Sequence, residues 1–112
     1  MPYQVTLLKR AEQDLHAAAD WIAEHSPAAA NRWFNGFVKT LLTLEHNPER
    51  CPLAPENQQV RYEVRQIFCG RSGGRIYRAV FVITENEVRV LRIRGAGQDV
   101  LRAKDLAGEK HG

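Results

Sequence analysis

Arginine is concentrated in one stretch of this chain. Residues 61–94 contain eight arginines, three glutamates and neither lysine nor histidine, a net charge of +5, whereas the whole chain carries +3. A guanidinium group presents a planar fork of N–H donors that matches a phosphate or a carboxylate. The arginine-rich pattern predicts an anionic partner, either nucleic acid or an acidic protein segment. The alternative is that the charges only keep an exposed strand face solvated, which explains the same pattern about equally well.

The spacing within residues 75–94 predicts where these arginines lie. The segment is apolar and β-branched on both sides of Glu85-Asn86, which is typical of a hairpin with a two-residue turn. Side chains alternate between the two faces of such a hairpin, and a turn of odd length would change the register. The expected core face carries Ile76, Val80, Val82, Leu91 and Ile93. The opposite face gathers Arg75, Tyr77, Arg92 and Arg94 at the end far from the turn.

Further polar residues extend this candidate site. With Cys69 opposite Arg75, a strand over 61–69 brings Arg65 beside Arg92. The predicted target- or anion-binding set is Arg65, Arg71, Arg75, Tyr77, Arg92, Arg94 and Gln98. If the protein is a nuclease, the catalytic candidates are Arg65, Tyr77, Arg92 and Arg94. We expect no metal and no cofactor, because neither the histidines nor the cysteines show metal-ligand spacing. Tyr77 is expected to be half buried, with its hydroxyl in water.

The elements that position these residues follow from periodicity. Residues 3–8 alternate as a strand, and helical spacing then predicts a helix ending near His25. Ser26-Pro27 is typical of a helix start, with Ser as the N-cap and Pro at the first position, and Asn47-Pro48 ends this second helix near His46. An irregular connection over 48–60 leads to the strands. A short helix is predicted over 99–107, and residues 108–112 are expected to fray.

This order predicts a two-layer α+β fold in which a helical hairpin packs on a small, antiparallel-rich sheet, with the sequence β-α-α-β-β-β and the short C-terminal helix. Residues 1–112 are long enough for one domain with a real core. The sequence shows neither an apolar run of membrane-spanning length nor a signal peptide, so we expect a cytoplasmic protein without membrane contact. Cys51 and Cys69 are expected to be thiols.

In this order the residues resemble the RelE/ParE superfamily of toxins from type II toxin–antitoxin systems, over about 3–98. No single motif carries the resemblance; the ordered set does. It consists of Ala11-Glu12-Gln13-Asp14-Leu15, Trp21-Ile22-Ala23, Asn47-Pro48-Glu49-Arg50, Val64-Arg65, Arg75-Ile76-Tyr77-Arg78 and Val90-Leu91-Arg92-Ile93-Arg94. The resemblance implies a growth-inhibiting toxin with a cognate antitoxin as its partner.

The resemblance leaves three functions open. A RelE-like member is a ribosome-dependent endoribonuclease that cuts mRNA, which requires proton-transfer groups. A ParE-like member binds DNA gyrase and is not a nuclease. A third reading is an antitoxin-binding module that has lost toxicity. Many members place a histidine after the last strand, where this chain has Gly95-Ala96-Gly97. The lack of a proton-transfer pair favours the ParE-like function, and therefore a binding protein rather than an enzyme.

Overall fold

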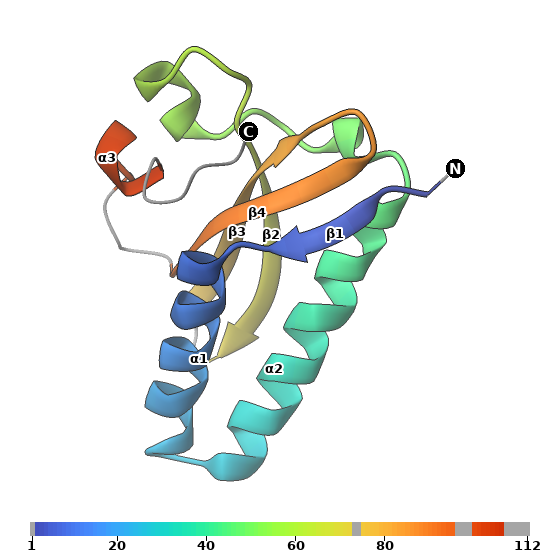
Figure 1. Cartoon of the computed structure of the whole chain (residues 1–112). Coiled ribbons are helices and arrows are strands. Elements are labelled where there is room, and N and C mark those ends of the chain that lie inside the picture. Colours follow the sequence, from blue (N-terminus) through green and yellow to red (C-terminus); the bar gives the residue numbers. More distant parts are fainter. Residues whose placement is uncertain (1, 73–74, 96–99, 107–112) are drawn as a thin grey trace.

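The computed structural model describes residues 2–72, 75–95 and 100–106 (Figure 1). The predicted order of elements is confirmed, including the short C-terminal helix. Gln98 and the expected frayed end, 108–112, lie outside the described residues. The elements are β1 (Gln4–Leu7), α1 (Lys9–Ala23), α2 (Pro27–Leu42), β2 (Arg65–Ser72), β3 (Arg75–Ile83), β4 (Glu87–Gly95) and α3 (Ala103–Leu106), with 3-10 turns at Thr43–Glu45, Pro48–Arg50 and Pro55–Gln59.

The two long helices form a hairpin that begins as the sequence predicts. Ser26 is the N-cap of α2, and its Oγ accepts a hydrogen bond from the Ala29 N–H at 3.1 Å. Pro27 occupies the first helical position, where no N–H partner is needed. Figure 1 shows α1 and α2 side by side against the sheet. No helix of the described residues is long and apolar enough to cross a membrane.

The strands form one mixed sheet in the order β1-β4-β3-β2. β1 runs parallel to β4, and the other neighbours are antiparallel. The predicted two-residue turn at Glu85-Asn86 is confirmed. Thr84 and Glu87 flank it, and the Thr84 N–H donates to the Glu87 carbonyl at 2.8 Å. Near this turn the predicted register also holds, with Ile83 opposite Val88.

A bulge then breaks the predicted register. Phe81 pairs with Val90, but Val80 pairs with Arg92, so Leu91 is an extra residue on β4. Ala79 consequently lies opposite Ile93, where the sequence predicted Arg92. Because one inserted residue reverses the alternation, Arg92 and the residues after it change faces relative to β3. Alternation alone carries no signal for a bulge, so the sequence reading missed it.

The face that the helices cover is therefore the opposite of the predicted one. The helices pack on the face that carries Tyr77, which we had placed on the functional side. Aromatic and aliphatic side chains of α2, including Trp33 and Phe37, complete this main core. From the sheet it takes Cys69, Tyr77, Ala79, Phe81, Val88, Val90 and Ile93.

The other face is also covered, by a smaller apolar cluster. Val80, Val82 and Leu91, predicted as the main core, point into it. The 48–64 connection contributes Ala54 and Val64, and the C-terminal segment contributes Leu101 and Leu106. Strands that are apolar on both sides need two covers, and here the second cover is irregular chain plus one helical turn.

β2 also differs from its predicted bounds and register. It begins at Arg65 rather than Arg61, and Cys69 lies opposite Tyr77 rather than Arg75. Arg65 consequently pairs with Phe81, away from Arg92. The difference arises because β2 extends to Ser72, which pairs with Arg75, and the bulge at Gly70 offsets one residue of it. The side chain of Phe68, on this strand, is 59% exposed.

Both cysteines are thiols, as the sequence predicted. Each is buried, and burial together with the nearby Cys51 raises the pKa of Cys69 to about 12. A thiol with such a pKa stays protonated at neutral pH and is a poor nucleophile, so Cys69 acts as a small apolar side chain.

Two glycines allow a matched test of how β2 packs against α2. Gly70 has a φ of 55°, and a Cβ there would lie 3.0 Å from Trp33 Nε1. Replacement G70A should lower the free energy of unfolding by about 2 kcal/mol, because a left-handed backbone disfavours a side chain and the contact is tight. In helix α2, Gly36 offers open space, so G36A should raise it by about 0.5–1 kcal/mol. Urea denaturation measures the free energy of unfolding of both variants. An equal change in G70A and G36A would contradict the bulge geometry.

Candidate functional site

The predicted arginine cluster does not form as a single patch. Three of its members, Arg75, Tyr77 and Arg94, line one cleft of about 290 Å³ between α1 and the ends of β3 and β4. We call this the Trp21 cleft. Because of the Leu91 bulge, Arg92 is turned away from it, and Arg65 and Arg71 lie elsewhere. The cleft is lined by Asp14, Ala17, Ala18, Trp21, Arg75, Tyr77, Ile93, Arg94 and Gly95.

Trp21 gives the cleft its most unusual surface. Its side chain is 49% exposed, and the Arg75 guanidinium lies 5.2 Å from the centre of its ring. This is a cation–π contact, which holds a charged group against an apolar one at the surface. Sequence reasoning missed Trp21, although a signal existed: it lies outside the apolar stripe of Ala11, Leu15 and Ile22 on the same helix. The site therefore combines an exposed aromatic ring with guanidinium charge.

Tyr77 forms an inner wall of this cleft and is more buried than predicted. It is only 4% exposed, where the sequence suggested half burial with its hydroxyl in water. Its ring meets that of Trp33 edge-on, with 4.9 Å between the centroids. A side chain fixed in this way supports the cleft by packing, and it is poorly placed to stack on a nucleotide base.

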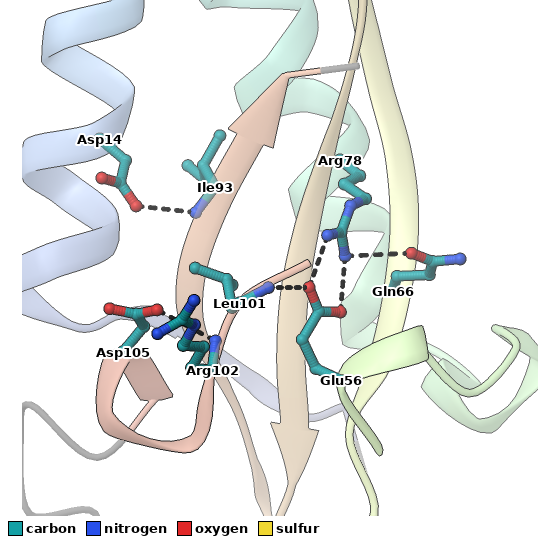
Figure 2. Close-up of polar contacts among 8 residues, drawn as sticks. All are labelled: Asp14, Glu56, Gln66, Arg78, Ile93, Leu101, Arg102 and Asp105. Carbon is teal, nitrogen blue, oxygen red and sulfur yellow. Dashed lines mark hydrogen bonds and ion pairs between the residues drawn. The ribbon is translucent and has the colours of Figure 1, made fainter. Parts of the chain in front are cut away.

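Arg92 forms a structural ion pair with Asp14. Its Nε and Nη2 donate to Asp14 at 2.7 and 3.1 Å, and these bonds raise the pKa of Arg92. The same carboxylate accepts the Ile93 N–H at 3.0 Å (Figure 2). β1 pairs with β4 only as far as Val90, so Asp14 takes over the hydrogen bonding of the strand edge beyond that point. It thereby fixes α1 to the sheet.

Arg65 holds the connection between the helices and the sheet. Its Nη1 donates to the Cys51 carbonyl at 2.7 Å and to the Glu49 carbonyl at 3.3 Å. Its Nη2 contacts the exposed Glu63 carboxylate at 3.2 Å. Arg65 is thus far from the Trp21 cleft and has a structural task. Among the described residues, no group of three metal-ligating side chains occurs.

A buried ion pair between Glu56 and Arg78 was not predicted. Glu56 is fully buried and binds Arg78 through two hydrogen bonds, of 2.9 and 2.6 Å (Figure 2). Gln66 accepts a further bond from Arg78 at 3.2 Å. The Leu101 N–H donates to Glu56 at 2.8 Å, so this carboxylate ties the C-terminal segment to the sheet. Glu56 lies in a proline-rich connection whose sequence gives no pattern that would pair it with β3.

The charge of Glu56 is maintained by these contacts. Burial alone would raise its pKa, but the hydrogen bonds from Arg78 and Leu101 outweigh burial, and the pKa lies below its ordinary value of 4.5. The stabilisation is therefore complete above pH 4.5 and is lost as the pH falls through the lower pKa of the folded state.

This network predicts a pH-dependent stability. Replacement E56Q should lower the free energy of unfolding by about 3 kcal/mol at neutral pH, because it leaves the Arg78 charge buried without a carboxylate. The variant should also lose part of the decline in stability that the native chain shows below about pH 4.5. The control is E63Q, which removes an exposed carboxylate. Urea denaturation across this pH range measures both variants, and similar curves for E56Q and E63Q would contradict the assignment.

The family assignment follows from comparison of the chain with known proteins. The family described as the ParE toxin of the type II toxin–antitoxin system parDE matches residues 5–100. The protein therefore belongs to the ParE toxin family, within the superfamily that the ordered motifs resemble. It is a ParE-like toxin component of a type II system. No curated protein gives a significant match.

Comparison with solved structures supports the fold. A chain of the chromosomal ParDE toxin–antitoxin system from P. aeruginosa superposes with a TM-score of 0.64 at 22% sequence identity. The match covers 81% of this chain and 92% of that chain. At this identity the likeness concerns the fold, and the assignment of individual site residues depends on the geometry described above.

Proposed function

We propose that this toxin inhibits growth by binding DNA gyrase through the Trp21 cleft, and that a cognate antitoxin inside the same cell neutralises it. Membership of the ParE family supports the class of action. The accessible pair of Trp21 and Arg75 supports the location, because tryptophan and arginine dominate the energetics of protein interfaces. Arg94 adds positive charge to the same cleft, which suits an acidic surface on the target.

The contacts of the other candidates favour binding over RNA cleavage. Cleavage requires a base for the 2′-hydroxyl and an acid for the leaving oxygen. Arg92 is held by Asp14, and Arg65 by backbone carbonyl groups and Glu63. Tyr77 is buried under Trp33, and residues 61–94 contain no lysine or histidine. Tyr77 and Arg94 share the Trp21 cleft, but Arg65 and Arg92 lie away from it, so the four nuclease candidates do not converge on one site.

The antitoxin, on this proposal, adds a strand to the edge of the sheet. β2 is an end strand in the order β1-β4-β3-β2, and its outer side pairs with the described chain only at its start, where Arg65 bridges Leu53. The rest of that side is the proposed site of backbone pairing. Phe68, on this strand, is 59% exposed and offers an apolar anchor beside that edge. An acidic or amphipathic antitoxin segment would complement both this edge and the basic strands.

Induction of the chain in bacteria tests the target. Binding to gyrase predicts filamentous growth with DNA damage, and the purified toxin should inhibit supercoiling by purified gyrase. Rapid loss of translation with cut messages would instead support the RelE-like ribonuclease. Normal growth at confirmed expression would support an antitoxin-binding module without toxicity. Either of the last two outcomes would refute the gyrase proposal.

Surface variants test the Trp21 cleft. Replacements R75Q and W21A should each weaken inhibition of supercoiling by about tenfold or more, since anchors of this type contribute about 2 kcal/mol to an interface. R61Q removes the same charge from an exposed position outside the cleft and serves as the control. Inhibition is measured at matched concentrations of folded protein, and equal potency of R75Q and R61Q would exclude the cleft.

A further inference from the structure

A second cavity, of about 330 Å³, lies between α2 and β2, away from the Trp21 cleft. We call it the Trp33 cavity. Two arginines contribute to its walls, and no acidic residue does. The lining consists of Ala29, Arg32, Trp33, Gly36, Gly70, Arg71 and Ser72.

The indole of Trp33 supplies a buried hydrogen-bond donor beside this cavity. The side chain is 4% exposed, and its Nε1 has no hydrogen-bond partner among the described residues. The ring is fixed by Phe37 and Tyr77, whose centroids lie 5.1 and 4.9 Å away. The N–H therefore cannot turn towards another partner without disturbing the core. A buried donor without an acceptor is rare in folded proteins and marks this position for a ligand.

The bulge at Gly70 forms the wall of the cavity beside that donor. The left-handed backbone of Gly70 brings the chain close to the indole, and a Cβ would lie 3.0 Å from Nε1. Since glycine has no Cβ, the backbone can approach the indole this closely without a side chain covering it. Gly36 has the same effect on the helix side, where a Cβ would meet no atom within 4 Å. Both glycines thus keep side chains out of the cavity.

The charges around the cavity are also uncompensated. Arg32 and Arg71 are exposed, and neither forms an ion pair with a described residue. This distinguishes them from Arg65, Arg78 and Arg92, which are all paired with acids. Their side chains have flexible stems, so they can admit a ligand and then close on it.

We propose that the Trp33 cavity binds a small oxyanion, a carboxylate or a phosphate group. The Trp33 N–H acts as a fixed neutral donor, and Arg32 and Arg71 supply the opposing charge from α2 and β2. Arginine suits either group, because its fork matches two oxygen atoms at once. The inference is independent of the toxin's target, since the cavity shares no residue with the Trp21 cleft.

The two tryptophans of the chain make a direct test possible. In a ¹⁵N-labelled full-length sample, the indole N–H groups of Trp21 and Trp33 give two separate NMR signals. Replacement W21F assigns them without touching the core, because Trp21 is exposed. Sodium acetate and inorganic phosphate are then titrated separately at constant pH, with sodium chloride holding the ionic strength fixed. The Trp33 signal should shift until it saturates, and the Trp21 signal should stay in place.

Variants show whether the response comes from the cavity. The double replacement of Arg32 and Arg71 by glutamine should weaken binding by about tenfold or more, through loss of the charge-assisted bonds. R61Q should bind as the native chain does. G36L should block the cavity without loss of thermal stability, because the new side chain starts in open space. Folding of each variant is checked by its thermal midpoint.

The outcomes separate clearly. Saturation with acetate alone identifies a carboxylate site, saturation with phosphate alone a phosphate site, and saturation with both a general oxyanion site. A Trp33 signal that moves with neither probe would overturn the proposal. The proposal would also be overturned if the double arginine variant reached half-saturation at the same anion concentration as the native chain. The ligand would then not be held by these side chains.

Discussion

The central strands of this protein are apolar on both faces, and this constraint determines the rest of the structure. One face is covered by the α1–α2 hairpin, and the other by the 48–64 connection and the segment 100–106. The second cover contains little regular structure, so it depends on the buried pair of Glu56 and Arg78 for its position. Buried ion pairs contribute little net stability but penalise every arrangement that separates them, which suits a segment that must be held in one place.

The arginines of residues 61–94 divide into those that hold the fold together and those that stay exposed. The sequence presents them as one basic stretch, but in the folded chain three of the eight have structural roles. Arg92 secures α1, Arg78 secures the C-terminal segment, and Arg65 secures the connection. Arg75 at the Trp21 cleft and Arg32 and Arg71 at the Trp33 cavity remain exposed. The net charge of a segment is therefore a weaker guide to function than the partner that each charge finds.

The sequence was sufficient for much of the fold, because its signals are local. The N-cap at Ser26, the turn at Glu85-Asn86 and the helical spacing of α2 each depend on neighbouring residues, and all were predicted correctly. The candidate site was predicted only in part. Its geometry depends on the Leu91 bulge, and an extra residue in a strand leaves no trace in alternating apolar character. The pairing of Glu56 with Arg78 could not be predicted either, because the two residues are 22 positions apart in the sequence and only tertiary packing brings them together.

The parallel pairing of β1 with β4 also bears on synthesis. Among the described strands, the first strand pairs only with residues Glu87–Val90 of β4, more than 80 positions later in the sequence. During translation the N-terminal strand therefore has to wait until β4 has left the ribosome. Such distant pairing delays folding and exposes apolar surface in the meantime. A chain that stops before Glu87 therefore lacks the described partner of its first strand.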